Sequence, residues 1–167
     1  MDMVTDLKSR ARLWTRGNTF EDFTIGRTFT HHWGRTLGEI DNTLFTTLTL
    51  HYNPQYLNAE VAGANGHDRG RPINPLLVFN TVFGLSVEDL SEGGGPFLGV
   101  DECVYGMPVY VGDTLTATSE VISARESDKR PNFGIVTWAT RGLNQDGEEA
   151  IRFRRSNLVR RRDMQGE

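Results

Sequence analysis

Residues 74–90 read NPLLVFNTVFGLSVEDL. Asparagine is a favoured N-cap residue and proline fits the first position of a helix, so Asn74 and Pro75 together mark a helix start. The residues that follow are apolar on nearly every face of a helix, which is typical of a buried helix. The glycine-rich SEGGGP at residues 91–96 then ends it. This stretch predicts a buried central helix around which the domain is built.

After residue 96 the pattern changes to that of β-strands. Four β-rich segments follow one another, at residues 97–113, 114–127, 133–150 and 151–162. Turn signals separate them at residues 111–113, 128–132 and 144–147. Because short turns join antiparallel neighbours, we predict four long antiparallel strands after the central helix.

The chain before the central helix carries a strand and a helix. RTFTHHWGRT, residues 27–36, has the threonine and aromatic content of a strand, with Phe29, His31 and Trp33 on one face. Thr36 followed by Glu39 is a capping-box pattern that predicts a helix over residues 37–50. Its apolar positions keep helical spacing: Leu37, Ile40, Leu44, Phe45 and Leu48.

A second, shorter helix is predicted over residues 54–62. Pro54 ends the first helix and can open the next, with Asn53 as its cap. Residues 62–72, AGANGHDRGRP, are glycine-rich and polar and predict a loop. With the strand at residues 27–36, the pattern predicts an α+β domain, in which an antiparallel sheet of five or more strands wraps round a central helix.

The chain divides into one domain and two short ends. Residues 1–16 are polar and mixed in charge and predict a tail or a surface helix. Residues 17–163 form the single predicted domain, and residues 164–167 a C-terminal tail.

Composition excludes several classes of protein. A net charge of -4 argues against a nucleic-acid or membrane-surface protein, whose domain would be basic. No apolar run approaches the roughly 20 residues that span a bilayer, and one cysteine excludes an internal disulfide. We therefore predict a cytoplasmic protein. The four histidines lack the spacing of a metal site, so no metal is expected.

Other motifs of catalysis are weak. The glycine cluster at residues 93–95 is followed by no lysine and predicts a plain loop rather than a phosphate cradle. Cys103 lies in a strand-like run, where a lone cysteine is usually inert core.

HYNPQYLN, residues 51–58, is the strongest candidate site. Polar groups that could have been apolar gather where a helix breaks, and a break projects side chains and free N–H groups toward whatever lies opposite. The alternative is structural: His51 and Tyr52 exposed, Asn53 a cap and Tyr56 packed.

Three segments resemble the MaoC-type hot-dog hydratase family. They are LFTTLTLHYNPQYLNAEVA at residues 44–62, GRPINPLLVFNTVFGLSV at residues 70–87 and MPVYVGDTL at residues 107–115. Over residues 17–163 the chain is most similar to the branch of mesaconyl-CoA, itaconyl-CoA and β-methylmalyl-CoA hydratases. The resemblance implies a hot-dog fold, paired with a second hot dog so that the active site lies at their interface.

The resemblance also implies catalytic positions, at which this chain departs from the family. Family members read Asp-x-Asn-Pro-x-His in a loop between helices, where the carboxylate and the imidazole handle the water and the α-proton. Here His51 replaces the aspartate and Tyr56 replaces the histidine, while Asn53 and Pro54 match. His51 is predicted to act as the base and Tyr56 as a proton donor.

The family polarises the thioester carbonyl with an N–H at the start of the central helix. Because Pro75 has no N–H, that donor is predicted to be Leu76 or Leu77, next to Asn74 and aided by Asn53. Arg69 and Arg71 could pair with a substrate carboxylate or a CoA phosphate, or could be solvated loop charges.

The predicted function is a hydratase or dehydratase of a short acyl thioester, such as a branched C5 dicarboxylyl-CoA. It needs no cofactor, and its partners are an acyl-CoA or carrier-bound acyl substrate and further copies in a homodimer or higher oligomer. Two alternatives remain: a biosynthetic dehydratase or isomerase on a carrier-bound or free acid, and a non-catalytic ligand-binding hot-dog protein.

Overall fold

The computed structural model describes residues 17–162 of the chain. The predictions for residues 1–16 and 164–167 lie outside this range. One six-stranded antiparallel sheet has the order β1-β4-β5-β6-β3, with β2 also paired to β4. Its strands are β1 (Thr28–Thr30), β2 (Arg35–Thr36), β3 (Phe97–Tyr105), β4 (Thr114–Glu126), β5 (Phe133–Leu143) and β6 (Glu149–Arg160). The helical elements are η1 (Phe20–Asp22), α2 (Glu39–Leu48), η2 (Pro54–Tyr56), α3 (Ala59–Ala64), α4 (Pro75–Leu85) and α5 (Val87–Leu90).

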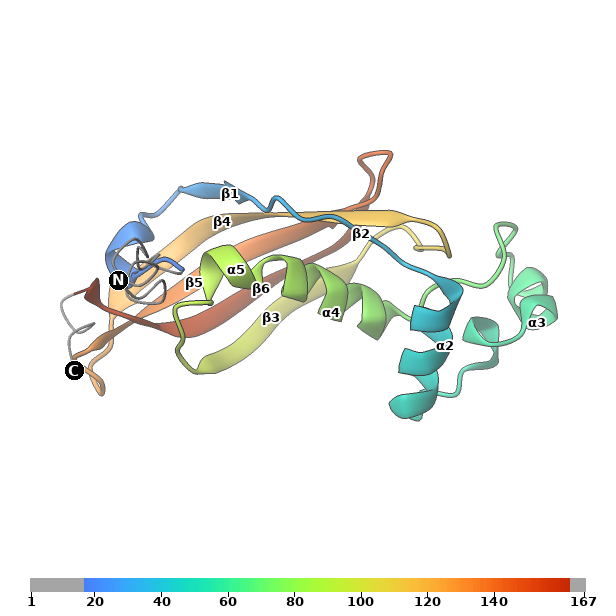
Figure 1. Ribbon diagram of the computed structural model, residues 1–167, viewed down its shortest axis with the longest axis horizontal. Coiled ribbons are helices and arrows are strands. Elements are labelled where there is room, and N and C mark those ends of the chain that lie inside the picture. The colour runs from blue at the N-terminus through green and yellow to red at the C-terminus, as the bar shows by residue number, and fades with distance from the viewer. Residues whose placement is uncertain (1–16, 163–167) are drawn as a thin grey trace, which may run out of the picture.

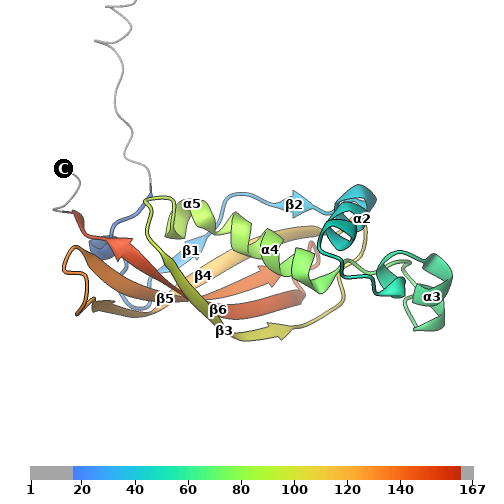
Figure 2. The same cartoon turned by 90° about the horizontal axis from the view of Figure 1, so that it is seen from below.

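The sheet curls round α4, and α2, η2 and α3 project beyond one end of it, next to the start of α4 (Figures 1 and 2). Val78 and Val82 of α4 pack with Leu115, Ile151 and other apolar residues of the sheet. A side chain at Gly142 of β5 would collide with Val82, so glycine lets the helix lie directly on the strand. The predicted α+β architecture is confirmed.

The order of the strands was not predicted. β3 comes first after the central helix, yet it pairs with β6 rather than with β4. β3 therefore forms one edge of the sheet. Its side chains Phe97, Leu98, Val104 and Tyr105 are largely exposed in the single chain.

The prediction of one buried central helix over residues 74–90 is corrected in two respects. The helix is interrupted at Ser86, which is the C-cap of α4 and the N-cap of α5. Leu76, Asn80 and Gly84, at helical spacing on α4, are exposed. The sheet covers only one side of the helix, and nothing within residues 17–162 covers the other.

The strand predicted over residues 27–36 is two short strands. The strands are interrupted between Thr30 and Arg35, where the His31 N–H still donates to Ala117 O of β4 at 3.1 Å and the His31 side chain is buried. Its Nδ1 lies 2.6 Å from Asp89 Oδ2 and its Nε2 2.9 Å from Ser119 Oγ. Burial lowers the pKa of His31, and the Asp89 carboxylate offsets this only in part. His31 is a structural histidine, while Trp33 is exposed.

The predicted capping box of the first helix is also wrong. Helix α2 begins at Glu39 with Gly38 as its N-cap, and Asp41 Oδ2 accepts the Gly38 N–H at 2.9 Å. Thr36 instead belongs to β2, where its hydroxyl lies 2.7 Å from that of Thr114. Pairing with β4 thus displaced the helix start by two residues.

Helix α2 turns its apolar side outward. Ile40, Leu44 and Leu48, which we call the α2 stripe, are 80%, 55% and 73% exposed. The buried positions of the same helix are polar, with Asn42 at 1% and Thr46 at 0%. Apolar spacing correctly predicted a helix, but the helix faces the opposite way from an ordinary surface helix.

The segment after Pro54 contains two short elements instead of one helix. Asn53 caps η2 by accepting the Gln55 N–H at 3.3 Å, as predicted. Asn58 then caps α3 by accepting the Glu60 N–H at 2.9 Å.

The prediction of a core cysteine is wrong, because Cys103 lies on the edge strand β3 and is exposed.

Candidate active site

The chain reverses direction at the end of α2, directly before His51. The Leu50 N–H donates to Thr47 O at 3.2 Å and the His51 N–H to Thr46 O at 3.1 Å. This pair of bonds is a Schellman motif, whose turning residue is usually glycine. Here it is Leu50, with a φ of 56°. A left-handed leucine costs about 1–2 kcal/mol, and such strain clusters at functional sites.

The turn directs His51 toward the start of α4. His51 Nδ1 lies 3.0 Å from Asn74 Nδ2 and 3.3 Å from Asn74 Oδ1. The Tyr56 ring meets the His51 ring edge-on, with 5.6 Å between centroids. Tyr56 is buried and His51 is partly exposed. The structure thus brings His51, Tyr56 and Asn74 together at the helix tip.

A buried polar network that the sequence reasoning missed supports these three residues. Asn42 Oδ1 accepts the Asn74 N–H at 2.8 Å, and Asn42 Nδ2 donates to Tyr56 O at 3.2 Å. Asn74 Nδ2 donates to Thr46 Oγ1 at 3.1 Å. The available signal was the polar pair Asn42 and Thr46, four residues apart on α2, where an ordinary helix would bury apolar side chains.

A cavity of about 190 Å³ adjoins this network. It lies between η2, the start of α4 and the end of β3, and its polar lining includes Gln55, Tyr56, His67 and Tyr105. His51 does not line the cavity itself, but its ring contacts the ring of Tyr56, which does. Burial raises the pKa of Tyr105 to about 12, so this phenol stays neutral. Whole-ligand pockets usually measure about 300–1,000 Å³, so the space suits one small group.

Sequence reasoning also missed His67. Its Nδ1 lies 3.0 Å from the Tyr110 hydroxyl. His67 lines the cavity together with Tyr56, whereas His51 does not. The glycine-rich loop in which it lies carried no signal of this position.

The first turn of α4 has its N–H groups engaged within the chain. The Leu76 N–H donates to Asn74 Oδ1 at 3.0 Å, and the Leu77 N–H to Asn74 O at 2.9 Å. Pro75 has no N–H. The side chain of Asn74 therefore occupies the place that an oxyanion would take at this helix tip.

The other predicted site residues make structural contacts. Asn53 is an exposed cap, as described above. Arg71 forms an ion pair with Glu39 and donates to Leu57 O at 3.2 Å. Arg69 forms an ion pair with Asp113 at 2.6 Å, with its guanidinium 4.6 Å from the centre of the Tyr110 ring.

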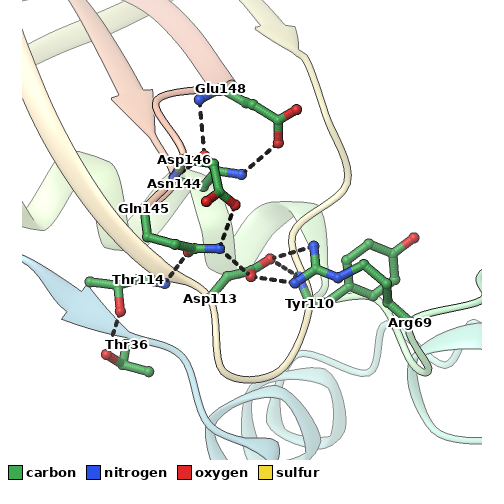
Figure 3. Close-up of polar contacts among 9 residues, drawn as sticks. All are labelled: Thr36, Arg69, Tyr110, Asp113, Thr114, Asn144, Gln145, Asp146 and Glu148. Carbon is green, nitrogen blue, oxygen red and sulfur yellow. Dashed lines mark hydrogen bonds and ion pairs between the residues drawn. The ribbon is translucent and has the colours of Figure 1, made fainter.

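Asp113 is the centre of a polar cluster next to the site (Figure 3). It is 2% exposed and accepts hydrogen bonds from Arg69, the Tyr110 N–H and Gln145 Nε2. Burial alone would raise the pKa of this carboxyl, but these donors outweigh burial and hold the pKa below its usual value. The cluster fixes the 67–73 loop to the β3–β4 and β5–β6 turns.

Two features of other classes of protein are absent from residues 17–162. No group of three or more His, Cys, Asp or Glu side chains in this range is arranged to hold a metal ion. None of its helices is both long enough and apolar enough to cross a membrane.

The curled sheet, the central helix and the polar helix tip define a hot-dog domain of the MaoC-like class. A sequence family described as mesaconyl-CoA hydratase matches residues 2–166. The chain belongs to the mesaconyl-CoA hydratase family. The mesaconyl-CoA hydratase of Haloarcula hispanica is 37% identical over 158 residues, which cover 94% of this chain and 44% of that protein.

Solved structures agree with this assignment. A MaoC domain protein dehydratase from Chloroflexus aurantiacus is 36% identical with a TM-score of 0.83, over 90% of this chain and 42% of that one. A protein of Mycobacterium tuberculosis with a double hot-dog fold is 20% identical with a TM-score of 0.78, over 90% of this chain and 46% of that one. The second likeness shows the fold alone. This chain spans less than half the length of the first four curated relatives it matches.

Proposed function

We propose that this domain hydrates a short enoyl thioester, or dehydrates the corresponding hydroxyacyl thioester. The observation that carries the proposal is the meeting of His51 and Tyr56 at the tip of α4, beside a cavity of about 190 Å³. An apolar pocket with a few convergent polar groups is the usual form of a small-molecule site.

The reaction needs no oxidant or reductant. In hydration the hydroxyl of water bonds to the β-carbon, and the other proton of the water ends on the α-carbon. The phenol of Tyr56 would donate a hydrogen bond to the oxygen that adds or leaves. The imidazole of His51 would contact the acyl thioester, with Asn74 behind it.

The proposed substrate class is a branched C5 dicarboxylyl-CoA, in line with the family to which the chain belongs. Arg69 is our candidate contact for an anionic group of the substrate, because its side chain is 54% exposed despite the ion pair with Asp113. We assign Arg71 a structural role, because its guanidinium already joins Glu39 to the 54–58 segment.

The test is an absorbance assay on the purified protein. Mesaconyl-CoA, crotonyl-CoA and the matching free acids are offered separately, and we expect loss of the enoyl-thioester band with one of the CoA substrates. Turnover of a free acid alone would favour the alternative dehydratase. Absence of turnover with all of them overturns the proposal, and calorimetric binding of a thioester without turnover would favour a ligand-binding domain.

We further propose that a second copy of this chain completes the site by forming a homodimer. Nine residues of β3 form a sheet edge with exposed apolar side chains, and such an edge invites pairing with another strand. The α2 stripe is a second apolar surface, and its last residue, Leu48, lies three residues before His51. Covering both surfaces would enclose the substrate between the two domains. This chain covers only 44% of the mesaconyl-CoA hydratase of Haloarcula hispanica, so that protein is long enough for two such domains, which supports this arrangement.

Replacing Ile40 by lysine is expected to weaken the dimer. Burying an isoleucine stabilises by about 1.5–3 kcal/mol, and a two-fold interface loses this twice, so the dissociation constant should rise about 100-fold or more. Analytical ultracentrifugation over a concentration series measures the change. Ile25→Lys is the matched control, because Ile25 is 69% exposed and lies before β1, away from the stripe. A monomeric wild-type protein, or an unchanged Ile40→Lys dimer, contradicts the proposal.

A further inference from the structure

The orientation of the Asn74 amide is fixed by its neighbours. Its Oδ1 accepts the Leu76 N–H at 3.0 Å, and its Nδ2 lies 3.1 Å from Thr46 Oγ1. Exchanging the oxygen and the nitrogen would place two donors against each other at Leu76. The residue is fully buried, and its own N–H is held by Asn42. The position of Nδ2, a donor with two hydrogens, is therefore determined.

This orientation determines where His51 carries its proton. His51 Nδ1 is 3.0 Å from Asn74 Nδ2, closer than its 3.3 Å to Oδ1. A proton on Nδ1 would bring one N–H against another at the shorter distance. The shorter contact favours Nδ1 as the acceptor from Asn74 Nδ2 over Nδ1 as a donor to Oδ1, and in the neutral imidazole the other nitrogen, Nε2, then carries the proton.

We infer that Asn74 is a positioning residue that keeps the proton of neutral His51 on Nε2, so that His51 meets the substrate as a hydrogen-bond donor and not as a base. This inference rests on the proposed function for its role in the reaction. It differs from the sequence-based expectation, in which His51 was the base.

The inference supplies a hydrogen-bond donor that the tip of helix α4 itself lacks. Leu76 and Leu77 donate to Asn74, so the start of α4 cannot present those N–H groups to a thioester oxygen. The Nε2–H of His51 takes their place and stabilises the negative charge that develops on that oxygen while the α-carbon gains or loses its proton. A neutral imidazole can polarise a carbonyl in this way. Through Asn74, the His51 side chain thus replaces the N–H groups of the helix start as the hydrogen-bond donor.

Nitrogen-15 NMR of the imidazoles in the full chain tests the inference directly. A ring nitrogen without a proton resonates far downfield of one with a proton, and loss of a signal in His51→Gln assigns the residue. For the neutral imidazole of His51 we expect a bare Nδ1 and a protonated Nε2. A protonated Nδ1 in the wild-type protein overturns the inference.

Asn74→Asp is the decisive variant. A carboxylate still caps α4, and the Thr46 hydroxyl can turn to donate to it, but it cannot donate to His51. We expect the His51 proton to appear on Nδ1. Asn58→Asp is the matched control, because Asn58 caps α3 in the same way, and it should leave the His51 signals unchanged.

An unchanged His51 spectrum in Asn74→Asp, or the same shift in Asn58→Asp, contradicts the inference. Should Asn74→Asp fail to fold, the wild-type spectrum alone decides. The NMR measurement needs no substrate. A protein without turnover can therefore still show the expected proton position, and the failure of the proposed function is distinguished from the failure of this inference.

Discussion

Replacing His51 by alanine is expected to lower kcat for the enoyl thioester by about 100- to 1,000-fold. Loss of one donor to a developing oxyanion has an effect of this size because the interaction strengthens in the transition state. KM should change much less, since the ground-state carbonyl carries little charge. Steady-state kinetics measures both constants. His32→Ala is the control, because that side chain is 57% exposed and lies on the β1–β2 connection.

Tyr56→Phe tests the other half of the same site. The ring that packs against His51 is kept, and only the hydroxyl is lost, so stability should hardly change. We expect kcat to fall by about 100-fold, which is typical for the loss of a positioned proton donor. If either variant turns over thioester at the wild-type rate, the paired role of these two side chains is wrong.

Replacing Asp113 by alanine is expected to reduce the free energy of unfolding by about 3 kcal/mol. The change leaves the Tyr110 N–H and Gln145 without their acceptor, and removes the partner of Arg69. In a chain of this size the melting temperature should fall by about 6–12 °C. Asp128→Ala is the control, because Asp128 is exposed in the β4–β5 turn. Equal melting temperatures for the two variants would show that the Asp113 cluster does not stabilise the fold.

The contribution of Asp113 also has a defined pH dependence. Its folded-state pKa lies below the unfolded value, so its stabilisation is fully present above the unfolded pKa and disappears as the pH falls through the folded pKa. Acid unfolding of Asp113→Ala should therefore begin from a lower stability but lose less on acidification. Chemical denaturation at neutral and acid pH measures the difference, and parallel curves for wild type and variant would contradict this cause.

Much of the fold could be predicted because its signals are local. Alternation in residues 114–126 and 133–143, and turn residues at 111–113 and 144–147, predict antiparallel strands wherever they occur. The cap at Asn74 and the helix after it were predicted for the same reason. The pairing of β3 with β6 was not, because strand order depends on how the whole sheet closes round α4.

Helix α2 shows the limit of pattern reasoning most clearly. Periodicity shows which residues share a face of a helix, but it does not show which part of the protein or solvent that face contacts. Here the apolar face meets solvent in the single chain, and Asn42 and Thr46 are buried because they hold the 51–74 network together. Hydrogen bonds to Asn74, which is distant in the sequence, thus decided which residues of α2 are buried.

For the site, the sequence located the bend that carries His51 and Tyr56, since a proline and a cap break a helix locally. It could not show that Asn74 contacts His51 across 23 residues, or that the helix-tip N–H groups are already engaged. The predicted oxyanion donors, Leu76 or Leu77, were taken from the resemblance to the family, which does not show the side-chain hydrogen bonds of this chain.

By itself the sequence determined most of the helices, strands and turns and the bend with its imidazole and phenol, because each depends on neighbours within a few residues. The tertiary structure alone decided which strand became the sheet edge, which face of α2 was buried and which nitrogen of His51 meets a donor. Those outcomes depend on contacts between distant segments, whose geometry exists only once the sheet has closed on its helix.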